Sequence, residues 1–202
     1  MIVLCSNGLT SEKLLQRVGS LLHNCKTAAL VVTADPDYRE KNYHVPHCRA
    51  ELEALGLTVT ICDLDFQPAE TLLHFDVVEF IGGNPYYLLD VLHKYHAEPV
   101  LQALARERCL IGWSAAAFVF GPTLALVDRY SPEMNTPDLT DLTALGLTDV
   151  QVLPHYSRFL ARFDGFEDTC RAYEEAHGIT VLRLNDGDGV IIQDDEIQLV
   201  QA

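Results

Sequence analysis

The stretch Cys109-Leu-Ile-Gly-Trp-Ser-Ala-Ala-Ala117 combines a short apolar run, a serine and a series of small residues. The run CLIGWS (109–114) predicts a buried strand, and the alanines after it predict the start of a helix. A serine between a strand and a helix, with small residues on both sides, is what a nucleophile elbow requires. Such a turn would expose Ser114 at the carboxyl edge of a sheet, where the helix amides point at a developing anion. Ala116 stands where the general pattern has glycine, and a buried strand followed by a serine-capped helix fits the same residues.

Short apolar segments alternate with segments of helical pattern on both sides of this stretch. Strands are predicted at residues 1–6, 28–33, 57–64, 76–83, 109–114, 150–153 and 179–184, and a hairpin at 190–200 that turns at Asp194–Asp195. Helices are predicted at 9–23, 38–55, 68–73, 85–93, 98–107 and 163–176. Thr10 or Ser11 would cap the first helix, and Pro46 is expected to break or kink the second. Because the strands are apolar and not alternating, the sequence predicts an α/β fold: a three-layer sandwich with a mainly parallel central sheet, in a single domain over residues 1–202.

Acidic residues dominate the charge of the chain. Lys plus Arg total 14 and Asp plus Glu total 29, so the formal net charge is −15. Nucleic acids and anionic membrane surfaces both need a basic surface, so we expect neither as a partner. No apolar run reaches the ~18–20 residues that span a bilayer, and the start, MIVLCSNG, lacks the features of a secretory signal. With six cysteines that show no CxxC or zinc-finger spacing, the sequence predicts a reduced, cytoplasmic protein.

Two further motifs lie at predicted strand ends. In Phe80-Ile-Gly-Gly-Asn-Pro-Tyr-Tyr-Leu-Leu89, paired glycines let the backbone come close to a ligand, and their amides can donate to an oxyanion. A plain strand-to-helix turn with Pro85 at the first helical position fits the same residues. In Leu153-Pro-His-Tyr-Ser157, a histidine follows a short apolar strand. Neither motif is decisive alone.

Two other features have less specific interpretations. His44 and His47 are three residues apart and Cys48 is adjacent, so one helical face could carry a metal. Without a further ligand signal we predict no metal site. The stretch 130–149 is rich in turn-forming residues, and its length indicates a functional loop or an insertion beside the site.

The order of these motifs resembles the peptidase E family, which includes aspartyl dipeptidases and cyanophycin-degrading relatives. GGN follows a strand, GWSA ends the next, LPHY comes later, and an acidic residue lies in a late segment that ends in glycine. The resemblance implies a class I glutamine amidotransferase-like sheet with serine in place of the elbow cysteine. The order of the candidate residues along the chain independently favours this scaffold over an α/β-hydrolase. In an α/β-hydrolase triad the histidine comes last, after the acid, whereas no histidine follows His177 here.

The resemblance also implies roles for individual residues. Ser114 would be the nucleophile and His155 the general base. The amides of Gly83 and Ala115 would form the oxyanion hole, and Asn84 would shape the substrate pocket beside them. Two departures from the family pattern, an alanine for glycine after the elbow and a proline after GGN, leave the substrate specificity open.

The third catalytic member would lie in Leu184-Asn-Asp-Gly-Asp-Gly189. Aligning this segment with the family's late L-P-E-G pattern puts Asp186 at the acid position, with Asp188 as the rival. A solvated turn, with Asn, Asp and Gly chosen for turn geometry, would also explain the segment. Asp141 and Asp149 are more distant alternatives on the long loop.

The leading hypothesis is a serine peptidase that hydrolyses short peptides in the manner of a dipeptidase. By resemblance the substrate would be a small peptide, with an amino-terminal aspartate as one candidate, and neither metal nor organic cofactor is needed. An acidic substrate requires a local cation, for which Arg129, Arg158 and Arg183 are candidates and Arg158 is favoured. We expect a monomer or a homodimer. The alternatives are a non-catalytic binding or regulatory protein on the same scaffold, and an esterase-type serine hydrolase.

Overall fold

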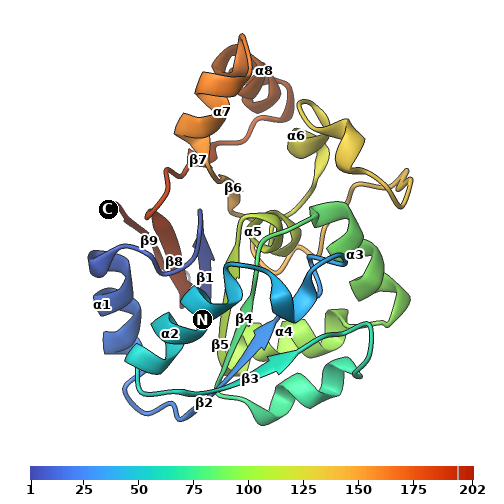
Figure 1. The fold of residues 1–202 in the computed structure, drawn as a ribbon. Coiled ribbons are helices and arrows are strands. Elements are labelled where there is room, and N and C mark those ends of the chain that lie inside the picture. Colours follow the sequence, from blue (N-terminus) through green and yellow to red (C-terminus); the bar gives the residue numbers. More distant parts are fainter. Residues whose placement is uncertain (195) are drawn as a thin grey trace.

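The computed structural model describes residues 1–194 and 196–202, and these form a central sheet of seven strands (Figure 1). The strands are β1 (Ile2–Cys5), β2 (Thr27–Val31), β3 (Thr58–Cys62), β4 (Val77–Phe80), β5 (Cys109–Trp113), β8 (Gly189–Gln193) and β9 (Glu196–Val200). Their order across the sheet is β3-β2-β4-β5-β1-β8-β9. Strands β1 to β5 pair in parallel, whereas β8 and β9 add two antiparallel strands at one side. The mainly parallel sheet is as predicted, and it brings the carboxyl ends of β1, β4 and β5 to one edge.

Helices cover both faces of the sheet, which confirms the three-layer sandwich. They are α1 (Glu12–Leu21), α2 (Val45–Ala54), α3 (Pro85–Lys94), α4 (Glu98–Glu107), α5 (Ala115–Phe120), α6 (Ala125–Asp128), α7 (Tyr156–Arg162) and α8 (Phe166–His177). Short 3-10 turns occur at Arg39–Lys41, Ala69–His74 and Pro132–Met134. Buried side chains of α1 and α2 form one apolar core with the sheet, and those of α3, α4 and α5 form another on the opposite face. Because helices cover both faces of the sheet, its central strands are apolar on both sides.

The local sequence explains where the helices begin. Ser11, not Thr10, caps α1, because its side chain accepts a hydrogen bond from the amide of Leu14 at 3.3 Å. The helix predicted at 38–55 begins at Val45, so the prediction was too long at its start. Pro46 lies in the first turn of α2, where its missing N–H costs nothing, and therefore starts the helix instead of kinking it.

A smaller sheet carries the histidine motif. Strand β6 (Gln151–Leu153) pairs in parallel with β7 (Val181–Arg183), and these two strands form a sheet of their own. Figure 1 shows them with α7 and α8 beyond one end of the central sheet. Helix α7 directly follows His155 and was missed in the sequence, where its seven residues are too few to display a clear helical period.

The end of the described chain confirms the antiparallel hairpin of β8 and β9. Its predicted turn at Asp194–Asp195 includes Asp195, which lies outside the described residues. Residues 130–149 contain the turn at Pro132–Met134 and an isolated bridge from Thr143 to Thr123, and are otherwise irregular. None of the described helices is long and apolar enough to span a bilayer.

Candidate active site

Ser114 lies on a strained turn between β5 and α5. Its backbone has φ 51° and ψ −110°, and its amide donates to the carbonyl oxygen of Cys5 at 3.1 Å. A positive φ is uncommon for any residue except glycine and is found at turns that present a functional side chain. The small residues around it are required by packing: a Cβ on Gly112 would lie 2.5 Å from the ring of Phe120. The strand–turn–helix geometry expected of an elbow is therefore present.

The imidazole of His155 lies between Ser114 and Asp186. Its Nε2 is 3.0 Å from Ser114 Oγ, and its Nδ1 is 2.7 Å from Asp186 Oδ1. The three side chains come from the β5–α5 turn, the β6–α7 turn and the loop between β7 and β8. His155 itself has left-handed backbone geometry, with φ 56°. The structure thus brings together the three residues that the sequence proposed as nucleophile, base and acid, in hydrogen-bonded series.

The choice between the two candidate aspartates follows from their bonds. The carboxylate of Asp188 accepts hydrogen bonds from the amides of Asn185 and Ala202, each at 2.9 Å. It is buried and holds the loop and the end of the chain in place. Asp186 is the member of this pair that reaches His155. Asp141 and Asp149 are exposed on the long loop, and Asp141 caps a local turn at Thr143.

The charge of Asp186 is stabilised from three sides. Burial opposes its ionisation, but the hydrogen bond and charge of His155, with smaller contributions from Ser6 and Arg158, lower the pKa of Asp186 below its ordinary value. Arg158 forms an ion pair with Asp186 Oδ2 while 65% of its own side chain stays exposed. Asp186 is therefore a carboxylate at neutral pH, as a partner for a positively charged imidazole must be.

Ser6 is a part of this site that sequence reasoning missed. Its hydroxyl donates to Asp186 Oδ1 at 3.0 Å and accepts a hydrogen bond from the amide of His155 at 2.9 Å. It is completely buried at the carboxyl end of β1. In the sequence, Ser6 could have been noticed as the polar residue that ends the apolar run MIVLCS, at the end of a predicted strand. One hydroxyl thus holds both the backbone of the histidine and the carboxylate that the histidine contacts.

Gly83 and Ala115 supply two amides near the serine. Gly83 has φ 154°, and a Cβ at this position would lie 2.2 Å from the carbonyl oxygen of Ala34, so a larger residue cannot be accommodated. In the described part of the chain, the Gly83 amide has no recorded hydrogen-bond acceptor. Ala115 is the first residue of α5, where a helix leaves its N–H groups without internal partners. Both amides are therefore available to a ligand.

Asn84 connects α3 with the long loop. Its Oδ1 accepts hydrogen bonds from the amides of Tyr86 and Tyr87 at 2.9 and 3.1 Å, which caps α3. Its Nδ2 donates to the carbonyl oxygen of Met134 at 2.7 Å. The side chain is thus used within the protein: it fixes the glycine turn and ties the long loop to it. Asn84 also lines the pocket that adjoins the serine pocket, so the expectation that it shapes the substrate site stays a prediction.

The serine and histidine open into a pocket of about 290 Å³. Its lining residues are Asn7, Asn42, Tyr43, His44, Gly82, Gly83, Trp113, Ser114, His155 and Arg158. A second pocket, of about 630 Å³, shares Asn42, Tyr43 and Gly83 with the first. The first pocket contains a cationic side chain, Arg158, and no carboxylate among its lining residues. Arg158 is paired with Asp186 behind this surface, so the pocket presents a cationic group whose charge is balanced within the protein.

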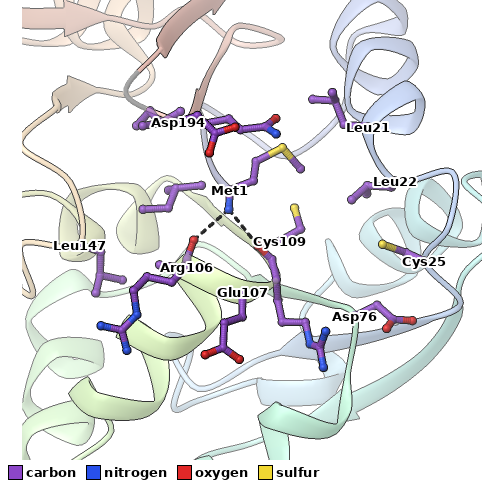
Figure 2. A pocket seen from close by; sticks show the side chains of 15 residues that line it. Met1, Leu21, Leu22, Cys25, Asp76, Arg106, Glu107, Cys109, Leu147 and Asp194 are labelled. Atoms are coloured by element: carbon purple, nitrogen blue, oxygen red, sulfur yellow. Dashed lines mark hydrogen bonds between the residues drawn. The ribbon is translucent and has the colours of Figure 1, made fainter.

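A separate pocket lies at the opposite edge of the sheet (Figure 2). It is formed around Met1 and Cys109, where β1 and β5 begin, and the amino nitrogen of Met1 donates there to the carbonyl oxygens of Ala105 and Arg108. It contains none of the residues proposed for catalysis.

The other candidate residues do not converge on the site. Arg183 pairs with Glu174 at 2.5 Å and with Glu167 at 3.2 Å, away from the serine. Arg129 does not line the serine pocket.

His44, His47 and Cys48, which the sequence offered as a possible metal face, lie in different surroundings. His44 lines the serine pocket, His47 is exposed and Cys48 is buried in the core. Burial, together with the nearby charges of His47, Arg158 and His155, lowers the pKa of His44, so this second imidazole of the pocket is neutral at pH 7.

The α/β sandwich and the hydrogen-bonded series of Ser114, His155 and Asp186 define a class: proteins with the site geometry of serine hydrolases. Within that class, the chain belongs to peptidase family S51, whose family model matches residues 2–200. It is 31% identical over 137 residues to an uncharacterised peptidase of Listeria innocua, covering 65% of each chain. It is 29% identical over 150 residues to peptidase E of Citrobacter koseri, covering 74% of this chain and 63% of that one. The matched part thus spans about two thirds of these relatives.

Solved structures show the same fold. A crystal structure of a protein assigned to peptidase E in Listeria monocytogenes EGD-e superposes with a TM-score of 0.76 at 22% identity. That match covers 100% of this chain and 98% of the other. A peptidase from an acI-B1 actinobacterium gives a TM-score of 0.72 at 17% identity, covering 100% and 87%. These likenesses establish the architecture independently of close sequence similarity.

Proposed function

We propose that the protein is a serine peptidase that hydrolyses short peptides through Ser114, His155 and Asp186. The observation that carries the proposal is the pair of contacts made by one imidazole, 3.0 Å to Ser114 Oγ and 2.7 Å to Asp186 Oδ1. A base must hydrogen-bond to its nucleophile while its other nitrogen is held by an acceptor. Membership of a peptidase family and the peptidase E names of relatives support amide bonds as the substrate.

The reaction begins when Ser114 Oγ attacks the scissile carbonyl carbon and His155 Nε2 takes the hydroxyl proton. The resulting oxyanion is stabilised by the amides of Gly83 and Ala115. His155 then gives the proton to the leaving amine, the C–N bond breaks, and the acyl group remains as an ester on Ser114. A water molecule, deprotonated by His155, then attacks the carbonyl carbon of this ester, the bond to Ser114 Oγ breaks as His155 returns the proton to that oxygen, and the acid is released. Asp186 stabilises the imidazolium in both halves of the reaction.

The size and charge of the site favour a small peptide. The pocket of about 290 Å³ at the serine and the adjoining pocket of about 630 Å³ meet at Gly83. They can therefore hold the two sides of one scissile bond, whereas a folded protein chain would need a longer groove. Arg158 at the first pocket favours a substrate with an acidic amino-terminal residue.

The test is hydrolysis of a dipeptide panel, with and without acidic amino-terminal residues, by the wild type and Ser114→Ala. The expected loss in turnover is about 10⁴–10⁶-fold, because a triad without its nucleophile keeps only residual activity. Circular dichroism of the variant checks that the fold is retained. Wild-type activity in Ser114→Ala would refute the mechanism.

Two other outcomes distinguish the alternative functions. A non-catalytic binding protein would not react with a fluorophosphonate probe and would cleave none of the dipeptides. An esterase would react with the probe and cleave small esters but not dipeptides. The proposed peptidase reacts with the probe at Ser114 and cleaves dipeptides.

A further inference from the structure

Three side chains with metal-ligating atoms converge in the core beneath α2. Cys48 and Glu51 come from α2, and Glu79 comes from the middle of β4. The Cys48 Sγ and one carboxylate oxygen of each glutamate all lie within 4.8 Å of one another. Residues three apart on a helix share a face, and the neighbours of Glu79 on that side of β4, Val77 and Ile81, belong to the core that α2 covers. The convergence therefore follows from the register of the strand and the helix.

Glu79 is the unexplained member of this cluster. Its side chain is completely buried, and in the described part of the chain neither carboxylate oxygen accepts a hydrogen bond of good geometry, although the Cys48 thiol and the Trp113 indole N–H lie close enough to favour its charged form. No lysine or arginine among the described residues pairs with it or with Glu51. Glu51 uses one oxygen to accept the amide of Leu9 at 3.1 Å. A buried acid without partners is destabilising unless it stays protonated or a cation neutralises it.

We infer that Cys48, Glu51 and Glu79 form a site for a divalent cation of the zinc type. A thiolate with two carboxylates suits Zn²⁺, which accepts both sulfur and oxygen ligands, and does not suit Mg²⁺ or Ca²⁺, which take oxygen alone. Tetrahedral Zn²⁺ would hold the ligand atoms about 3.3–3.8 Å apart. The ligand atoms lie within 4.8 Å of one another, so small changes in the glutamate torsions would bring them to this spacing.

Glu51 is the least buried of the three ligands. Cys48 is 3% exposed and Glu79 is completely buried, whereas Glu51 is only partly buried. A water molecule would complete the coordination from the Glu51 side. Without the cation, burial and the charge of Glu51 raise the pKa of Glu79 to about 8, and burial raises the pKa of Cys48, so the ion replaces protons when it binds.

The site would stabilise the active-site wall and take no part in the chemistry. Trp113 separates the two: its side chain lines the serine pocket, and its buried indole N–H has no partner among the described residues. It also directly precedes Ser114. A cation bound to Glu79 would hold the Glu79 carboxylate beside the indole N–H of Trp113. This contact would in turn fix the position of Trp113, the residue before Ser114. The hydrolysis itself proceeds through Ser114 and His155.

The experiment measures binding of Co²⁺ and Zn²⁺ to protein freed of metal by a chelator. We expect one equivalent of Co²⁺, with the near-ultraviolet charge-transfer absorption that a thiolate ligand produces, and displacement of Co²⁺ by Zn²⁺. Glu79→Gln, which keeps the side-chain shape, should weaken binding at least about tenfold. Cys48→Ser should abolish the charge-transfer absorption. Cys170→Ser removes a buried thiol from α8 and is the matched control that should bind as the wild type does.

The readouts do not depend on peptidase activity, so they separate this proposal from the catalytic one. Glu79→Gln also keeps the test decisive if Cys48→Ser fails to fold. The inference is overturned if the wild type binds no stoichiometric metal, because the three groups are then simply protonated. It is equally overturned if Glu79→Gln binds Co²⁺ with unchanged affinity and absorption.

Discussion

Arg158 forms an ion pair with Asp186, the same carboxylate that accepts a hydrogen bond from His155. The cation that lines the substrate pocket is thus connected to the acid that orients the base. Because 65% of its side chain is exposed, Arg158 can turn toward a substrate carboxylate without leaving this corner of the pocket. In the proposed mechanism, this one residue would link the charge of the substrate to the orientation of the histidine base.

Replacing Arg158 should lower activity most on acidic substrates. For Arg158→Gln we expect kcat/KM on Asp-X dipeptides to fall about two- to fivefold more than on Ala-X dipeptides, which corresponds to one ion pair near a protein surface. Arg162→Gln is the matched control, because Arg162 lies on the same helix but packs over Phe163. Equal losses on both substrates would mean that Arg158 acts only through Asp186 and does not contact the substrate.

The two aspartates of the loop after β7 should separate catalysis from stability. Asp186→Asn should lower kcat about 10²–10⁴-fold, because an amide cannot stabilise the imidazolium as a carboxylate does. Asp188→Asn should leave kcat close to the wild-type value. It should lower the free energy of unfolding by about 1–3 kcal/mol, because Asp188 accepts two backbone amides in a buried position.

Steady-state kinetics and urea unfolding of both variants make the comparison. The assignment of Asp186 fails if Asp188→Asn is the variant that loses turnover, or if Asp186→Asn retains it.

Ser6→Ala should impair both stability and turnover. It removes the acceptor of the His155 amide and the hydroxyl donor to Asp186, both in a completely buried position. An unsatisfied buried amide costs about 1–3 kcal/mol, and loosening of the histidine should lower kcat roughly tenfold with little effect on KM. Ser6→Thr, which keeps the hydroxyl, should recover part of the loss in kcat. A Ser6→Ala enzyme with unchanged kcat would show that other contacts suffice to orient His155.

Much of this site could be predicted because its residues sit in local patterns. Ser114 lies between an apolar strand and small residues, and His155 ends another strand, so sequence order alone places both at strand ends. Asp186 was harder, because a loop with two aspartates has no period that selects one of them. The two are distinguished by their contacts: Asp186 reaches His155, whereas Asp188 accepts the amides of Asn185 and Ala202.

What the sequence did not reveal depends on contacts between distant segments. Ser6 is 149 residues from His155 and looks like the last residue of an ordinary strand. Asn84 matches a motif position, yet its side chain is used to cap α3 and to hold Met134. Glu79 interrupts an apolar strand, and its significance emerges only when α2 brings Cys48 and Glu51 onto it. The contacts of Ser6, Asn84 and Glu79 therefore depend on strand pairing and on packing between distant segments.

Gly83→Ala should remove activity through the backbone. The new Cβ would lie 2.2 Å from the carbonyl oxygen of Ala34, so the turn that offers the Gly83 amide must move. Loss of one oxyanion donor costs about 10²–10³-fold in kcat. Gly146→Ala is the control, because Gly146 also has a positive φ but no atoms within 4 Å of a new Cβ. Normal kcat in Gly83→Ala would exclude this amide from the oxyanion hole.

The lowered pKa of Asp186 should be visible in the acid stability of the protein. A carboxylate whose pKa is lower in the folded state binds fewer protons there than in the unfolded chain. Its contribution to stability is therefore fully present above the unfolded pKa of about 3.9 and is lost as the pH falls through the lower folded value. The difference in unfolding free energy between the wild type and Asp186→Asn should thus shrink as the pH falls below about 4. Urea unfolding at a series of pH values measures it, and a difference that does not change with pH would show that His155, Ser6 and Arg158 do not stabilise the charged form.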